Sequence, residues 1–192
     1  MPIARDVLEA GGQAPPATRK VWDPFVRLFH WSLVGLFVAA YATGDENDAL
    51  HIRLGYAIAV LLALRVVWGF VGTRHARFAD FVRSPREIAA YLRAILAGRA
   101  ERHIGHNPAG GAMILALIAM LTGTCVTGIM MTTTRFWGSD LVEEVHEVLA
   151  AATVGLILLH VAGVVMASLA HRENLAAGMS LLDTVDGVVM LH

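Results

Sequence analysis

The sequence predicts an all-α membrane protein in which four transmembrane helices form an up-down bundle. The 192-residue chain is 56% hydrophobic and has a mean hydropathy of +0.59, which is too apolar for an ordinary soluble domain of this size. Four apolar runs are long enough to cross a bilayer, which takes about 20 residues of helix. Turns separate these runs, so successive helices are expected to alternate in direction.

The predicted spans begin or end at residues that typically bound helices. Asp23 is an N-cap residue followed by Pro24 at the first helical position, and the first span ends at Gly44. Asn107 and Pro108 form a second opening of this kind before the third span. The four predicted spans cover residues 24–43, 50–71, 108–133 and 140–170.

These spans are assigned to one membrane domain, predicted to cover residues 21–174. A flexible cytoplasmic N-terminal tail (residues 1–20) is expected before it, because that segment lacks the apolar core of a signal peptide. A cytoplasmic C-terminal tail (residues 175–192) is expected after it. The single cysteine, Cys125, excludes an internal disulfide, a paired-thiol redox motif and a covalent haem attachment motif. Metal chemistry in this chain is therefore expected to use histidine.

The distribution of charge predicts the orientation of the bundle. Arginine and lysine concentrate before the first span and between the second and third spans, whereas acidic residues predominate on the opposite side. The positive-inside rule then places both termini in the cytoplasm. Within the basic loop, a helical apolar pattern predicts either a helix in the cytoplasmic headgroup layer or a solvated helix packed on the bundle. Its apolar residues are Ile88, Tyr91, Leu92, Ile95 and Leu96.

His146 and His160 are the most informative pair in the chain. Fourteen residues of helix advance about 21 Å and complete nearly four turns, so both imidazoles leave almost the same face. A histidine at bilayer depth without a partner would leave ring nitrogens unsatisfied, and imidazole is a strong ligand for iron. We therefore expect each histidine to have a partner on another helix at its own depth.

Depth along the bundle selects these partners. The fourth span enters from the outer side, where His51 also opens the second span, whereas His30 lies about 10 Å into the first span from the cytoplasmic side. The predicted pairs are His51 with His146 and His30 with His160. Imidazoles can fill both axial positions of a porphyrin iron, so the sequence predicts two non-covalent, bis-histidine haem b groups between the helices. The alternative interpretation is a set of interhelical hydrogen bonds.

Other residues are compatible with flat macrocycles between helices. Arg65 lies about 15 residues into the second span, where a charge is costly and needs an anion such as a haem propionate. Arg27 and Arg53 are further candidates for this contact, with interfacial snorkelling as the alternative. Small residues would admit a porphyrin edge or, alternatively, let helices pack closely. The small residues concerned are the glycines Gly35, Gly55, Gly155 and Gly163.

Several segments resemble the bacterial cytochrome b561 / nickel-dependent hydrogenase b-type cytochrome family over about residues 21–178. The segments are VWDPFVRLFHW, HIRLGY, LRVVWGFVGTRHARFADFV, GHNPAGG, VHEVLAAATVGLILLHVAGV and HRENL. The resemblance implies two b-type haems held by histidines of the first, second and fourth helices, which match His30, His51, His146 and His160. It also implies a multi-pass protein of the bacterial cytoplasmic (inner) membrane.

The resemblance implies electron transfer between membrane quinone or quinol and a redox protein such as a cytochrome c or a hydrogenase-type subunit. Membrane lipid is the other expected partner, and no nucleic acid is expected. His106 is interpreted as a cap-region residue, a quinone hydrogen-bond partner or a propionate contact. A stand-alone superoxide:quinone or quinol oxidoreductase is an alternative function. A haem-free cation or proton transporter is a second alternative function. Such a transporter would be expected to carry carboxylates at bilayer depth, whereas the acidic residues here lie almost entirely at the helix ends.

Overall fold

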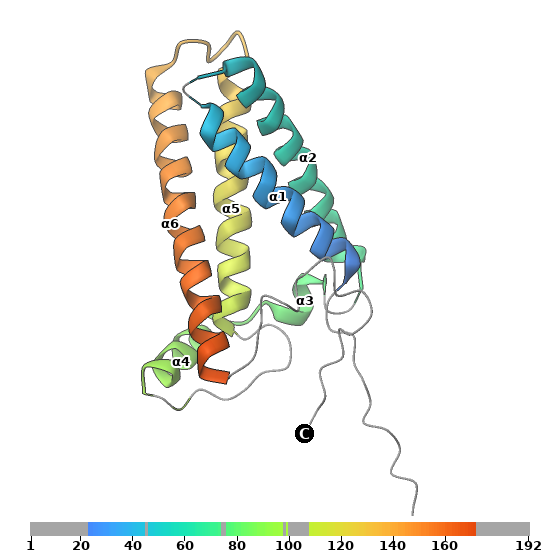
Figure 1. The fold of residues 1–192 in the computed structure, drawn as a ribbon, viewed down its shortest axis with the longest axis vertical. Helices are drawn as coiled ribbons and strands as arrows, with labels where there is room; N and C mark the ends of the chain where they lie inside the picture. The colour runs from blue at the N-terminus through green and yellow to red at the C-terminus, as the bar shows by residue number, and fades with distance from the viewer. Residues whose placement is uncertain (1–22, 45, 74–75, 98, 100–107, 172–192) are drawn as a thin grey trace, which may run out of the picture.

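Four long helices dominate the computed structural model, which describes residues 23–44, 46–73, 76–97, 99 and 108–171 (Figure 1). Each of the four is long and apolar enough to cross a membrane. They are α1 (Pro24–Thr43), α2 (Asp48–Val71), α5 (Pro108–Met131) and α6 (Asp140–His171). The all-α membrane fold predicted from the sequence is therefore confirmed. The predicted tails and His106 lie outside the described residues.

Local capping fixes the helix starts close to where the sequence places them. The Asp23 carboxylate accepts a hydrogen bond of 2.8 Å from the backbone N–H of Phe25, and Pro24 occupies the first turn of α1. Helix α2 begins two residues before the predicted Leu50, because the side chain of Asn47 caps it and accepts from the Leu50 N–H. Satisfied first-turn N–H groups of this kind stabilise a helix end.

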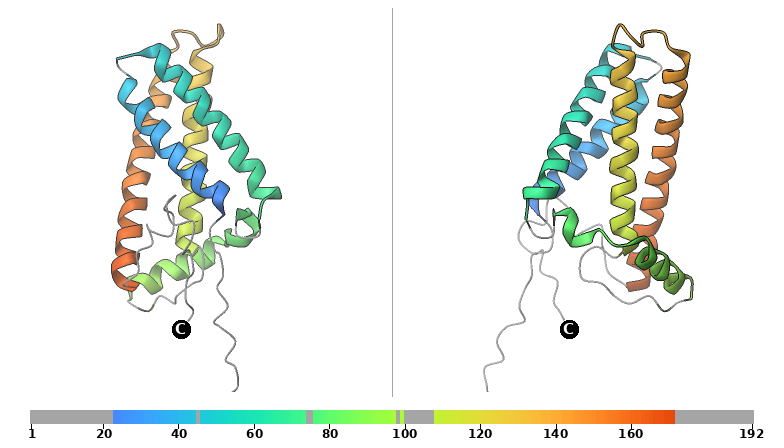
Figure 2. Two further views of the ribbon diagram at one scale, coloured as in Figure 1. Left: turned by 45° about the vertical axis from the view of Figure 1, so that its right-hand side comes forward. Right: turned by 180° about the vertical axis from the view of Figure 1, so that it is seen from behind.

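The four helices alternate in direction, as the two views of Figure 2 also show. Helix α1 packs on α2, α2 on α5, and α5 on α6. We call the end of the bundle where α1 and α5 begin the basic end, and the opposite end the acidic end. Exposed arginines define the basic end: Arg77, Arg83, Arg86, Arg93 and Arg99. Exposed carboxylates define the acidic end: Glu46, Asp48, Asp140, Glu143, Glu144 and Glu147.

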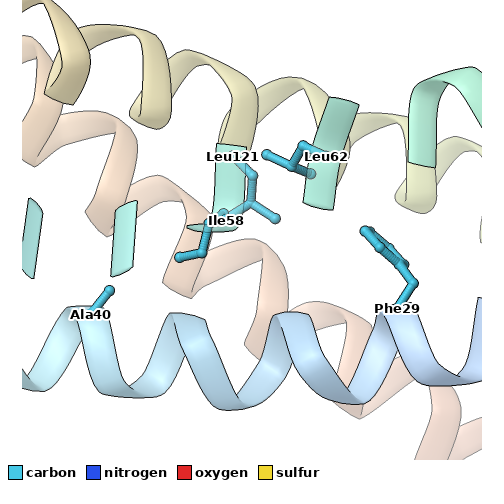
Figure 3. Packing of buried hydrophobic residues seen from close by; sticks show 5 residues of the cluster. All are labelled: Phe29, Ala40, Ile58, Leu62 and Leu121. Carbon is cyan, nitrogen blue, oxygen red and sulfur yellow. The ribbon is translucent and has the colours of Figure 1, made fainter. Parts of the chain in front are cut away.

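A small apolar core joins α1, α2 and α5 (Figure 3). Its buried members are Phe29, Ala40, Ile58, Leu62 and Leu121. No residue of α6 belongs to this cluster of described residues, since α6 packs closely on α5 instead. The face that α6 turns toward α1 and α2 is thus not used for tight apolar packing.

Two short helices lie between α2 and α5 at the basic end. The sequence does not predict α3 (Phe78–Phe81), which fits against small residues of both neighbours. A Cβ atom at Gly69 of α2 would overlap the Phe78 ring, and one at Gly111 of α5 would overlap the Phe81 backbone. The amphipathic segment predicted in this loop forms α4 (Pro85–Leu96).

Candidate functional site

His51 of α2 and His146 of α6 face each other at the acidic end. Their ring centroids are 6.1 Å apart and their planes are nearly perpendicular, at 83°. Metal–imidazole bonds are about 2 Å long, so two imidazoles bound to opposite sides of one metal would have ring centroids roughly 6 Å apart. The spacing of this pair would therefore let both histidines hold a single metal between them.

The tautomer of His51 is set by the backbone. Its Nδ1 lies 2.8 Å from the carbonyl oxygen of Ala40, the residue of α1 that closes the apolar core at this end. Because a carbonyl oxygen only accepts, Nδ1 carries the proton and donates it, which leaves the lone pair on Nε2. A metal-ligating histidine usually has its other ring nitrogen held in this manner.

His146 is held in the same state by α5. Its Nδ1 lies 3.0 Å from the carbonyl oxygen of Thr124 and 3.1 Å from Oγ1 of Thr127. The Thr127 hydroxyl donates its own proton to the carbonyl oxygen of Gly123 or of Thr124, each 3.0 Å from Oγ1. A lone pair of Oγ1 is therefore free to accept from Nδ1 of His146. His146 thus also presents an unprotonated Nε2.

His30 and His160, the inner histidines, lie nearly four helix turns further along the bundle than the outer pair, toward the basic end. Thr153, midway between His146 and His160 on α6, is fully buried, so this face of α6 points into the protein. His160 and His30 of α1 are both half-buried and are near enough to interact electrostatically. The Nδ1 atom of His30 is buried without a hydrogen-bond partner. His30 thus lacks the carbonyl partner at Nδ1 that both outer histidines have.

The helices that carry each facing pair do not pack closely on one another. Among the described residues, α6 makes its close contacts with α5, not with α1 or α2. Gly55 follows His51 by one turn and Gly163 follows His160 by nearly one turn, and a Cβ atom at either would meet nothing within 4 Å. Gly35 and Gly155 are equally open but lie on other faces of their helices. Close helix packing uses different glycines, such as Gly123, where a Cβ would lie 3.2 Å from Leu149.

The three candidate arginines have different surroundings. Arg65 is buried, donates from Nη1 to the Ala76 carbonyl at 3.2 Å and places its guanidinium over the Phe78 ring, 5.4 Å from the centroid. Asp23 supplies a nearby negative charge. Arg27 is buried on α1, whereas Arg53 is exposed near the acidic end. Protein groups thus already surround Arg65, whatever a cofactor adds.

Sequence reasoning missed the contribution of α5 to the site. Thr124 and Thr127 hold His146, and Gly128 lies against it, since a Cβ there would be 3.1 Å from Cε1 of the ring. Two threonines three residues apart and a following glycine, inside an apolar span, are the signal that marks this surface. Transmembrane threonines often bond only their own helix, so the signal is weak without a partner histidine.

Four apolar spans with histidines facing one another between helices are typical of membrane proteins that hold metal cofactors inside a bundle. Among the described residues, no group of three or more histidine, cysteine or acidic side chains is arranged to hold a metal ion. The two-histidine arrangement fits a metal whose remaining ligands come from a macrocycle.

Comparison with known proteins identifies the family. The profile of the prokaryotic cytochrome b561 family matches residues 21–180, and the chain belongs to this family. A probable Ni/Fe-hydrogenase B-type cytochrome subunit of Azotobacter vinelandii is 27% identical, covering 87% of this chain and 86% of its own length. A probable Ni/Fe-hydrogenase 1 B-type cytochrome subunit of Escherichia coli K12 is 28% identical over 56% of this chain and 57% of its own length. No solved structure shows a significant match.

The predicted family resemblance is thereby confirmed. The protein is a multi-pass membrane b-type cytochrome, and membership implies haem b and electron transfer.

Proposed function

We propose that this protein is a di-haem b-type cytochrome that transfers electrons across the cytoplasmic membrane between the quinone pool and a redox partner. His51 with His146 would ligate one haem, and His30 with His160 the other. The observation that carries this proposal is the 6.1 Å separation of the His51 and His146 rings, each with Nδ1 tied to a backbone carbonyl.

Haem b, when bound, supplies one-electron chemistry. At the outer site, the chain's own residues would hold the iron through Nε2 of His51 and His146 and keep Nδ1 protonated through the Ala40 and Thr124 carbonyls. With His51 and His146 both holding the iron, oxygen would find no free position there, which favours electron transfer over ligand binding. The 14-residue spacing on α6 separates the two sites by about 21 Å along the helix, enough to cover most of the bilayer core.

The acidic end is the proposed docking side for the redox partner. Exposed carboxylates lie at the same end of the bundle as the His51–His146 pair, including Asp48 of α2 and Glu143 and Glu147 of α6. Such a surface attracts a basic partner and speeds its association. The relatives are named as cytochrome subunits of Ni/Fe hydrogenases, which supports a hydrogenase-type partner. The basic end would then face the cytoplasm, with both termini.

The first experiment counts haem. Full-length protein, expressed with ample haem supply and purified in mild detergent, is assayed by pyridine haemochrome and by a reduced-minus-oxidised spectrum. Two non-covalent haems per chain, reducible by a quinol, are expected. One haem would contradict the four-histidine assignment, and no haem would contradict the proposal as a whole. Haem that a quinol fails to reduce would contradict the quinone-pool assignment alone.

A further inference from the structure

Helix α4 carries an apolar stripe that the protein covers only in part. Its first turn is fixed by a capping box, in which the Ser84 N–H donates to Glu87 at 2.8 Å and the Glu87 N–H donates to the Ser84 hydroxyl at 3.3 Å. None of its described side chains is buried. Leu92 and Ile95, on the same face as Ile88, remain 47% and 39% exposed. The helix is well formed, but its apolar face lacks a complete protein partner.

The position of α4 brings this stripe to a membrane boundary. Helix α4 lies crosswise to the long helices at the basic end, beside the last turns of α6 (Figures 1 and 2). It also packs against α5, which begins at this end. Because α5 and α6 are apolar spans, their ends at this side lie near the level of the lipid headgroups.

Charge on and beside α4 is complementary to anionic lipid. Arg86 and Arg93 are exposed, lie seven residues apart on one face, and point away from the apolar stripe. Between residues 76 and 99, the described chain has five arginines against Asp80 and Glu87. A helix with an apolar face and arginines on the other lies in the interface plane and binds phosphate headgroups.

We propose that α4 is an interfacial helix whose apolar stripe, Ile88–Leu92–Ile95, inserts at the acyl boundary and whose arginines Arg86 and Arg93 bind anionic phospholipid headgroups. The occupant is the leaflet at the basic end, which is the cytoplasmic leaflet in the orientation proposed above. The helix would hold the α2–α5 connection against the membrane surface.

Spin-label accessibility in the full-length protein tests the position of α4. Leu92→Cys and the matched control Ala90→Cys, which is exposed on the opposite face, are made in a Cys125→Ala background and reconstituted into discs of phosphatidylcholine with phosphatidylglycerol. We expect the label at position 92 to be accessible to oxygen and shielded from a water-soluble nickel chelate, and the label at position 90 to show the reverse. Water accessibility at both positions would mean a solvated helix. Shielding of position 92 from both reagents would mean cover by another protein or a second copy. Either result overturns the proposal.

The headgroup contact is tested with Arg86→Gln and Arg93→Gln. Each arginine near an anionic surface contributes about 1 kcal/mol, so selectivity for spin-labelled phosphatidylglycerol over phosphatidylcholine should fall by up to about five-fold per substitution. Arg135→Gln removes an exposed arginine at the acidic end and should leave that selectivity unchanged. Equal effects of all three variants would contradict a specific role for α4. These readouts follow lipid rather than haem, so they stand or fall separately from the proposed electron transfer.

Discussion

Thr127 of α5 and His146 of α6 are joined by a 3.1 Å hydrogen bond between Oγ1 and Nδ1. The Thr124 carbonyl accepts from the same nitrogen at 3.0 Å, so the imidazole proton is shared between two acceptors on α5. Helix α5, which bears no proposed ligand, therefore fixes the orientation and tautomer of His146, a proposed ligand on α6. Groups of this kind raise the basicity of a ligating imidazole and tune the metal.

Replacing Thr127 with valine removes one acceptor and keeps the side-chain shape. With less hydrogen bonding at Nδ1, the imidazole becomes a poorer donor to ferric iron, and we expect the midpoint potential of the outer haem to rise. Haem affinity should fall by about 10-fold, the low end of such effects, because the Thr124 carbonyl remains. Potentiometric titration and haem transfer to apomyoglobin measure the two quantities. Thr122→Val, the same change at a hydroxyl that bonds the Ile118 carbonyl of its own helix, serves as the control. Equal behaviour of the two variants would remove Thr127 from the site.

Gly128 gives a steric test of the same histidine. An added Cβ would lie 3.1 Å from Cε1 and 3.4 Å from Nδ1 of His146, which requires the ring to shift by a few tenths of an ångström. Gly128→Ala should therefore perturb the spectrum of one haem and reduce its occupancy. Gly155→Ala is the matched control, since a Cβ there meets nothing within 4 Å. Reduced-minus-oxidised spectra with haem counting compare the variants, and an unchanged Gly128→Ala spectrum would argue against ligation through His146.

The spans and the facing histidines were predictable because both follow from periodic rules. Twenty or more apolar residues specify a spanning helix, and depth along antiparallel helices indicates which histidines share a level. The support from Thr124 and Thr127 was not predictable, since it depends on how α5 is rotated against α6. The protein surroundings of Arg65 were not predictable either. Its burial was expected to require an anion, but the Ala76 carbonyl and Phe78 ring come from a short helix and turn that no pattern predicted.

Single histidine substitutions test the pairing. His160→Ala should remove the inner haem and retain the outer one, whereas His146→Ala should do the reverse, because each pair has only two axial donors. His30→Ala should give the same phenotype as His160→Ala, and His51→Ala the same phenotype as His146→Ala. Haem content should fall from two to one per chain in each case. Leu159→Ala, next to His160 but 59% exposed, should retain both haems. Matching spectra for His30→Ala and His146→Ala would mean that the pairs are assigned wrongly.

Arg65 distinguishes a structural role from cofactor binding. Arg65→Met keeps the apolar stem but removes the donor to the Ala76 carbonyl and one positive charge near Asp23. Hydrogen bonds to charged groups contribute about 1.5–3 kcal/mol, so we expect the free energy of unfolding to fall by about 2 kcal/mol. Detergent-induced unfolding followed by tryptophan fluorescence measures this loss, with the exposed Arg77→Met as control. If Arg65 acts only through the protein, haem spectra and midpoint potentials stay unchanged. A shifted potential of the inner haem, with little loss of stability, would instead support the propionate contact that the sequence predicts.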